Sequence, residues 1–110
     1  MTDKIVVFSS CASPDEADRI ARALVEKRLA ACVSVLPRAR SIYRWKGAVE
    51  SEEEQLLVIK TSRELFAEVR AEIEKQHSYE VPEIVALPIV DGSQRYLDWM
   101  DREMLERRGP

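Results

Sequence analysis

Residues 41–60, with the sequence SIYRWKGAVESEEEQLLVIK, decide the fold, because they predict one long β-hairpin. Gly47 marks the predicted turn between the arms Ser41–Lys46 and Ala48–Lys60. Side chains alternate along the first arm, with Ser41, Tyr43 and Trp45 on one face and Ile42, Arg44 and Lys46 on the other. At about 3.3 Å per residue the ladder reaches roughly 25 to 35 Å, longer than the usual strand of about 5 or 6 residues. Such a hairpin overhangs its own core, so we expect its apolar face to pack on another subunit.

The residues before the hairpin predict a strand, a helix and a second strand. Lys4–Ser9 is a continuous apolar run that is typical of a central strand buried on both faces. Ser13 is the predicted N-cap of a helix that ends near Leu29, with Pro14 in its first turn and Glu16 as partner in a capping box. Its predicted buried positions are Ala17, Ile20, Ala21, Leu24 and Val25. The next strand is Ala31–Leu36, and Pro37 after it predicts a bend or bulge.

The residues after the hairpin predict a helix, a strand and a last helix. Thr61 is the predicted cap of a helix that runs to about Gln76, with Glu64 as its capping-box partner. Its buried stripe is Leu65, Phe66, Val69 and Ile73. Residues 83–89 form the last predicted strand, which Pro88 confines to an edge or a strand end. Ser93 caps a short final helix that carries Tyr96, Leu97, Trp99, Met100 and Met104.

The order β-α-β-β-α-β plus a terminal helix predicts an α+β, ferredoxin-like fold in which two right-handed crossovers set strand one beside strand three. We expect one domain over residues 1–110, with a loose tail at 106–110. Helices cover one sheet face in this fold, yet the runs 5–8 and 56–59 place apolar side chains on both. Leaving them exposed forgoes roughly 1.5 to 3 kcal/mol each, so we expect the second face to be buried in an oligomer.

Composition excludes several classes of partner. The chain has 110 residues, 45% of them hydrophobic and 34% charged, with a net charge of −3. The acidic balance argues against nucleic-acid and anionic-membrane partners. No signal sequence or apolar run of about 20 residues is evident, so a cytoplasmic protein is expected. The two cysteines are too few for a disulfide framework and are expected to be reduced there. The acidic run 50–54 is interpreted as a solvated hairpin end.

Motifs for catalysis and RNA binding are missing. The three glycines form no phosphate-binding loop, and there is no G-x-S-x-G elbow. His77 is the only histidine, and neither cysteine lies in a motif that supports a Cys-His site, so an enzyme is not expected. Apart from Phe8, the predicted central strands carry aliphatic side chains rather than the stacking aromatics of an RNA-binding sheet.

Cys11 and His77 are the side chains best suited to a metal, because thiolate and imidazole are ligands for copper and zinc. Cys11 follows the first strand and His77 follows the second helix, so the fold can bring them together at one end of the sheet. Further ligands considered are Gln76, Glu80, Glu83, a water or a neighbouring chain. The alternative is a structural histidine that only forms hydrogen bonds. Cys32, within a strand, is interpreted as a small core side chain.

A second set of polar-tipped or charged side chains allows two interpretations. Its members are Tyr43, Trp45, Lys60, Tyr79, Glu83 and Trp99. The first interpretation is subunit packing, because Tyr and Trp suit contacts in which the ring is buried and its polar end faces water. The second is a small-ligand cleft between subunits, in which Lys60 faces an anion.

The sequence closely resembles the CutA, or divalent-cation tolerance, family over residues 4–99. The resemblance rests on Ala30–Val33, on Pro37 with Ser41–Gly47, on Lys60–Thr61, on His77–Ile84 and on Tyr96–Trp99. It implies a ferredoxin-like homotrimer, similar in architecture to the PII signalling proteins, with hairpins that reach onto neighbouring subunits. It also implies tolerance of copper and other divalent cations.

Carried over by position, the family's copper-site cysteine matches Cys11 and its histidine matches His77. The chain departs from the family at Gln76, where some members have a second histidine, at Ser78, where proline is common, and at Arg38, where glycine is common. We therefore expect a trimeric protein that binds divalent metal, copper by preference. The alternative is a PII-like signalling or scaffold trimer that binds a small anion or a protein partner at its intersubunit clefts.

Overall fold

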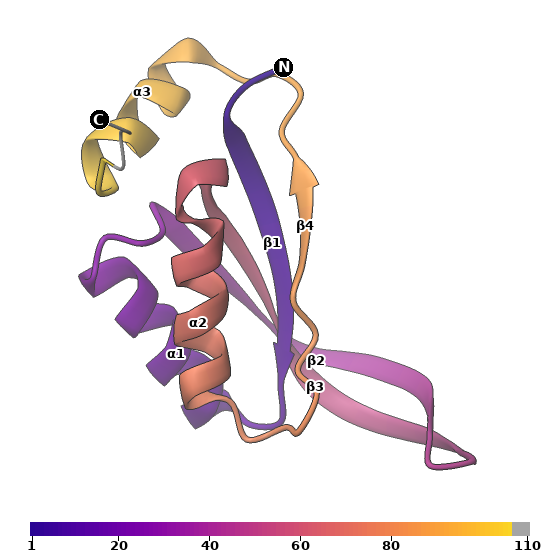
Figure 1. Ribbon diagram of the computed structural model, residues 1–110. Helices are drawn as coiled ribbons and strands as arrows, with labels where there is room; N and C mark the ends of the chain where they lie inside the picture. Colours follow the sequence, from indigo (N-terminus) through magenta and orange to yellow (C-terminus); the bar gives the residue numbers. More distant parts are fainter. Residues whose placement is uncertain (107–110) are drawn as a thin grey trace.

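The computed structural model describes residues 1–106 and has the predicted order of elements (Figure 1). The strands are β1 (Lys4–Cys11), β2 (Cys32–Trp45), β3 (Ala48–Ser62) and β4 (Val85–Pro88). The helices are α1 (Pro14–Glu26), a short 3-10 turn η1 (Arg63–Leu65), α2 (Phe66–Gln76) and α3 (Gln94–Glu103). The loose tail was predicted at 106–110, and residues 107–110 lie outside the described residues.

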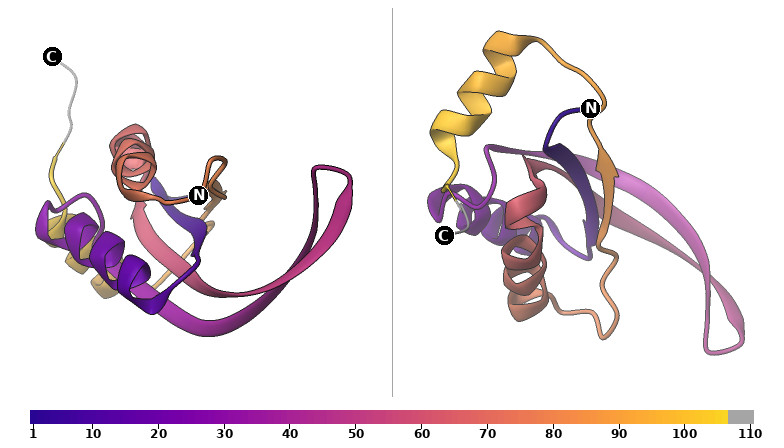
Figure 2. Two further views of the ribbon diagram at one scale, coloured as in Figure 1. Left: turned by 90° about the horizontal axis from the view of Figure 1, so that it is seen from below. Right: turned by 45° about the horizontal axis from the view of Figure 1, so that its top comes forward.

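The four strands form one antiparallel sheet in the order β2-β3-β1-β4. β1 pairs with β3 from Lys4↔Ser62 to Cys11↔Gln55, so the prediction that strand one lies beside strand three is confirmed. α1 and α2 lie side by side on one face of this sheet (Figures 1 and 2). The fold is therefore α+β and ferredoxin-like. β4 runs from Val85 to Pro88 and is shorter than the predicted strand at 83–89, and it lies at an edge of the sheet as Pro88 predicted.

The hairpin dominates the shape of the molecule. β2 has 14 residues and β3 has 15, and their pairing continues out to Trp45↔Ala48. Lys46 and Gly47 form the turn with φ of 49° and 84°, the left-handed geometry of a two-residue hairpin loop. The hairpin curls away from the helices and extends the molecule to 46 × 25 × 24 Å (Figure 2).

The predicted bend at Pro37 is a β-bulge within one continuous strand. The register between β2 and β3 shifts between Leu36 and Ala39, and Arg38 in the bulge has a φ of 62°. The predicted strand 31–36 and the predicted first arm of the hairpin are therefore one element. This agrees with the predicted order of elements, which has one strand before the hairpin turn, because a bulge bends a strand without ending its ladder.

The core lies between the sheet and the two helices α1 and α2. Its fully buried side chains include Val7, Leu57 and Ile59 of the sheet, Ile20 and Leu24 of α1, and Val69 and Ile73 of α2. Val25, predicted to be buried, is 43% exposed because α1 ends one residue later. The helix ends at Glu26 rather than near Leu29, and Arg28 beyond it adopts a left-handed φ of 60°.

The helix starts follow the predicted pattern only in part. The Glu16 N–H donates to the Ser13 hydroxyl over 3.2 Å, which confirms Ser13 as the cap of α1. Thr61 is not a cap: it stays within β3, and its buried hydroxyl donates to the Leu29 carbonyl over 2.7 Å. α2 consequently begins later, after the η1 turn. Ser93 occupies the cap position of α3, where its side chain accepts no capping hydrogen bond.

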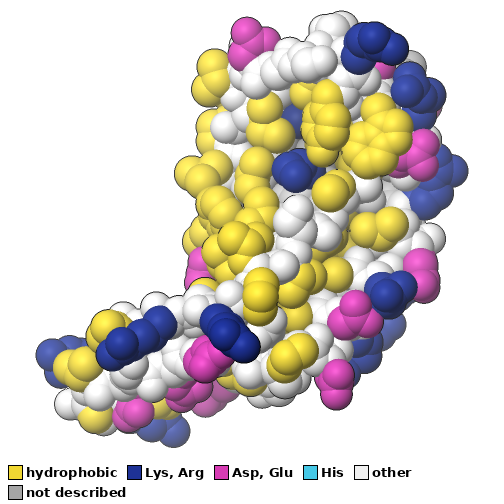
Figure 3. Space-filling view, turned by 180° about the vertical axis from the view of Figure 1, so that it is seen from behind, with side chains coloured by type: hydrophobic (Ala, Val, Ile, Leu, Met, Phe, Trp, Pro, Cys, Tyr) yellow, Lys and Arg dark blue, Asp and Glu magenta, His cyan; other side chains and the backbone are white. Residues whose placement is uncertain are grey.

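The sheet face opposite α1 and α2, which we call the open face, carries apolar side chains as predicted. The register places Val6, Phe8, Leu56, Val58, Val85 and Leu87 on it. Val85 and Leu87 are 50% and 51% exposed. Apolar side chains gather over this side of the sheet in Figure 3, whereas the projecting hairpin carries mixed charge. A surface of this kind is typical of a protein-protein contact.

Candidate metal site and acidic groove

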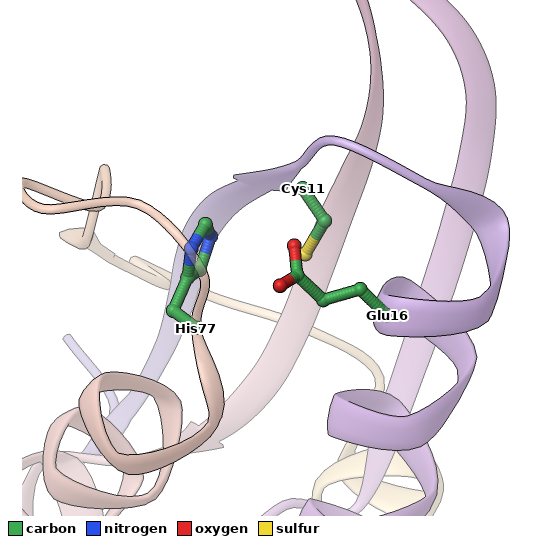
Figure 4. Close-up of side chains that lie close together, drawn as sticks. All are labelled: Cys11, Glu16 and His77. Atoms are coloured by element: carbon green, nitrogen blue, oxygen red, sulfur yellow. The ribbon is translucent and has the colours of Figure 1, made fainter.

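Three potential metal ligands converge at one end of the sheet (Figure 4). They are Cys11 at the end of β1, Glu16 in the first turn of α1, and His77 directly after α2. One ligand atom from each, sulfur, oxygen and nitrogen, lies within 4.8 Å of the others. The structure thus brings together the two residues that the sequence singled out, and adds Glu16 to them.

Both ring nitrogens of His77 take part in hydrogen bonds with backbone groups. The Tyr79 N–H donates to Nδ1 over 3.0 Å, so Nδ1 is unprotonated. Nε2 then carries the proton and donates it to the Ser10 carbonyl, 2.6 Å away. These two hydrogen bonds fix the orientation of the imidazole, which is the structural role considered as the alternative to metal binding. A metal that binds here must replace one of these two hydrogen bonds.

Glu16 holds an ionised carboxylate inside the site. Its side chain is buried and accepts hydrogen bonds from the Ser78 N–H over 2.8 Å and from the Ala12 N–H over 3.4 Å. Burial by itself raises the pKa of Glu16, but the hydrogen bonds from Ser78 and Ala12 and the proximity of His77 together outweigh it, and the net pKa lies below its usual value. The carboxylate ties the loop that carries His77 to the start of α1.

Cys11 contributes a fully buried thiol. Burial raises the pKa of Cys11 to about 12, and the negative charges of Glu16 and Glu54 add to this effect. The thiol is therefore protonated at neutral pH, and a metal must displace that proton. A thiolate, an imidazole and a carboxylate together suit copper or zinc, so the donor types fit a metal of this class.

Sequence reasoning missed Glu16 as a site residue because its spacing matched a capping-box partner. The further ligands considered instead lie outside the cluster of Figure 4. Gln76 donates to the Glu72 carboxylate, and Glu83 accepts a hydrogen bond of 3.4 Å from the Ser10 hydroxyl. The signal that could have found Glu16 is its position five residues after Cys11, at the helix start that follows the same strand.

A second feature is a groove of about 830 Å³ between the hairpin and the loop 78–83, which we call the acidic groove. Five glutamates contribute to its lining: Glu50, Glu52, Glu54, Glu80 and Glu83. Tyr43 donates to Glu52 over 3.0 Å, and Tyr79 donates to Glu54 over 2.6 Å. Burial, together with the Glu54 hydrogen bond, raises the pKa of Tyr79 above its usual range. Within residues 1–106, no Lys, Arg or His lines the groove.

The predicted cleft residues separate into two groups. Tyr43, Trp45, Tyr79 and Glu83 all line the acidic groove. Lys60 lies farther along β3, on the open face opposite Val6 and Cys32. Trp99, in α3, packs against the core and contacts the Tyr96 ring at a centroid distance of 5.4 Å. Within one chain, Lys60 therefore does not face a ligand in the groove, and the groove itself is too acidic to attract a small anion.

The two cysteines are both free thiols. Cys11 belongs to the helix-covered side of the sheet, whereas Cys32 shares the open face with Lys60. The prediction that Cys32 is a core side chain is wrong in that respect, and Cys32 is only half-buried. Among the helices of residues 1–106, none combines the length and apolar character needed to cross a membrane.

Comparisons of this chain with known sequences and structures agree with one another. The family described as CutA1 divalent ion tolerance protein matches residues 5–103. The divalent-cation tolerance protein CutA of Thermus thermophilus is 48% identical over 95 residues, which are 86% of this chain and 92% of the relative. The chloroplastic protein CutA of Arabidopsis thaliana is 40% identical over 87% of this chain and 53% of its own length, so this chain spans about half of that relative.

The crystal structure of CutA1 from Oryza sativa superimposes with a TM-score of 0.92 at 36% sequence identity, covering 94% of this chain and 95% of the other. The corresponding structure from Thermus thermophilus gives a TM-score of 0.89 at 46% identity, covering 92% and 98% of the two chains. Sequence and fold thus agree over nearly the whole length described. The chain belongs to the CutA1 family of divalent ion tolerance proteins.

Proposed function

We propose that this protein binds a metal ion, copper in preference to other divalent cations, through Cys11, Glu16 and His77, and that this binding serves metal tolerance. The observation that carries the proposal is the convergence of three donor atoms within 4.8 Å from three separate segments. Membership of a family named for divalent ion tolerance supports it. The sulfur and nitrogen donors favour copper or zinc over magnesium and calcium, which prefer oxygen.

The site is suited to holding an ion rather than to catalysis. A thiol with a pKa of about 12 is a poor nucleophile at neutral pH, and both ring nitrogens of His77 are engaged with the backbone. We therefore infer a binding protein and not an enzyme. The buried Glu16 carboxylate offsets part of the positive charge of a bound ion.

We further propose that residues 1–110 act as one domain that assembles as a homotrimer in the cytoplasm. The apolar open face and the projecting hairpin support self-association, because each leaves apolar surface that another subunit can cover. Two free thiols suit a reducing compartment. A PII-like role with a small anion gains no support from the acidic groove.

A metal titration of the reduced, metal-free protein tests this function. We would use Co²⁺, a divalent probe whose thiolate complexes are coloured, and Cu⁺ buffered by a competing chelator without oxygen. The expected result is one ion per chain, with a sulfur-to-cobalt absorption band. His77→Ala and Cys11→Ser should each lower the affinity at least tenfold, because each removes a ligand.

Cys32→Ser is the matched control, since it removes the other thiol without touching the cluster. Thermal unfolding of each variant distinguishes a lost ligand from a lost fold. Binding that is equally strong in the parent, Cys11→Ser and His77→Ala proteins would rule out this site, and an effect of Cys32→Ser alone would move the site to the open face.

A further inference from the structure

Lys60 is a charged side chain on an apolar surface, without a counter-ion among residues 1–106. It lies on the open face in β3, opposite Val6 on one side and Cys32 on the other. Among the side chains of residues 1–106, none forms an ion pair or hydrogen bond with its ammonium group. Any subunit that covers the open face takes this charge out of water, and a buried ammonium is stable only beside an opposite charge.

The described lining of the acidic groove carries negative charge without a cation to balance it. It contains five carboxylates and no basic residue among its described lining. Two of these carboxylates are already oriented, since Tyr79 donates to Glu54 and Ser10 donates to Glu83. Glu54 is only 5% exposed, so its charge is held where water screens it little. The groove is therefore prepared to receive a cationic group.

Lys60 cannot fill the groove of its own chain. Lys60 and Glu54 both belong to β3, six residues apart, and a strand of that length separates them by about 20 Å. Their side chains nevertheless share one face of the sheet, because side chains alternate between the two faces and six is an even number of residues. The hairpin curls toward that same face of the sheet (Figure 2), and the acidic groove lies between the hairpin and the loop 78–83.

We propose that Lys60 of one copy of this chain inserts into the acidic groove of a second copy, beside the carboxylates of Glu54 and Glu83. This inference rests on the self-association proposed above and identifies the charged pair that fixes its register. The contact is head-to-tail, because donor and acceptor sites lie at different places on the chain, and such contacts form a closed ring when the rotation between neighbouring copies closes. The anion expected opposite Lys60 is then a glutamate carboxylate of the neighbouring copy.

The charge pair explains why a lysine is compatible with this surface. Apolar contact on the open face drives association without fixing how the copies are rotated relative to each other. One ammonium group that must meet one set of carboxylates selects a single arrangement, since every other arrangement leaves a buried charge unpaired. Lys60 in this sense acts on specificity rather than on affinity alone.

Zero-length cross-linking tests the contact directly. A carbodiimide joins an amine to a carboxylate only where the two already touch. We would mix equal amounts of ¹⁵N-labelled and unlabelled protein, allow the copies to exchange, treat the mixture with the carbodiimide, and identify linked peptides by mass spectrometry. The expected product links Lys60 to Glu54 or Glu83 and contains one labelled and one unlabelled peptide.

Two lysine variants complete the test. Lys60→Met should abolish this cross-link and weaken self-association at least tenfold in sedimentation velocity, more so at low salt than at high salt. Lys75→Met is the control, because Lys75 is exposed on α2, away from the open face. If the protein assembles but no cross-link joins Lys60 to the groove, this inference is wrong and the proposed self-association still stands. A protein that sediments as a monomer overturns the oligomer as well.

Discussion

The buried thiol of Cys11 makes metal binding a proton exchange. Its pKa of about 12 lies well above neutral pH, so each ion that binds the thiolate releases one proton. Raising the pH lowers the competition from that proton. The apparent affinity for Co²⁺ should therefore rise about tenfold per pH unit between pH 7 and pH 8. Titrations at three pH values in that range, with a pH dye to count the released protons, provide the measurement.

Glu72→Gln is a suitable control for this pH dependence, because Glu72 is buried beside Lys27 and lies outside the metal cluster. It should keep the slope of the parent protein. Cys11→Ser should lose most of the slope together with the affinity. An affinity that does not change with pH in the parent protein would show that the Cys11 sulfur is not a ligand.

Residue types predicted the site better than residue spacing did. A thiol and an imidazole are recognisable metal ligands wherever they occur, so Cys11 and His77 could be selected from the sequence. Glu16 could not, because a glutamate three residues after a serine has an ordinary explanation as a capping residue. Its carboxylate instead reaches the Ser78 N–H, a contact between residues 62 positions apart that sequence spacing does not encode.

At the scale of elements, the hairpin turn is the most sensitive position. Gly47 has a φ of 84°, and a Cβ added there would meet no atom within 4 Å. A substitution at Gly47 therefore strains the backbone but does not disturb the packing of neighbouring side chains. We expect Gly47→Ala to lower the free energy of unfolding by about 1 kcal/mol, the usual penalty for a left-handed alanine. Chemical denaturation at fixed protein concentration measures this change.

Gly92→Ala is the matched control. The φ of Gly92 lies outside the left-handed region, and the nearest atom to an added Cβ is the Leu97 side chain at 3.4 Å, an ordinary contact. Its effect should stay within about 0.5 kcal/mol, as for most surface substitutions. Equal losses in the two variants would contradict a backbone origin for the effect at Gly47.

Element types could be predicted more reliably than their ends. The apolar periodicities of residues 4–36 and 55–76 identify the strands and helices, because burial on one or both faces fixes the period. Their ends depend on competing hydrogen bonds. Thr61 has the sequence features of a helix cap, yet β1 pairs with β3 as far as Ser62, and the Thr61 hydroxyl donates a hydrogen bond to the Leu29 carbonyl. Tertiary pairing prevailed over the local capping signal.

For the whole molecule, the proposed self-association depends on the open face. Val58 lies near the middle of that face, between Phe8 on β1 and Ser34 on β2, and points away from the helical core. Val58→Asp would place a carboxylate inside the proposed contact. Burying it there without a partner costs several kcal/mol, which is comparable to the contribution of the neighbouring apolar side chains.

We expect Val58→Asp to convert the proposed trimer into a folded monomer. The core should survive, because the substituted side chain does not contact it, so circular dichroism should retain the parent spectrum while sedimentation equilibrium gives the mass of one chain. Val25→Asp, at an exposed position on α1, should leave the oligomer unchanged. Leu87→Asp, on the neighbouring edge strand of the same face, should reproduce the monomer. If both open-face variants kept a mass of three chains, the subunits would have to meet elsewhere, and the apolar residues of the open face would need another partner.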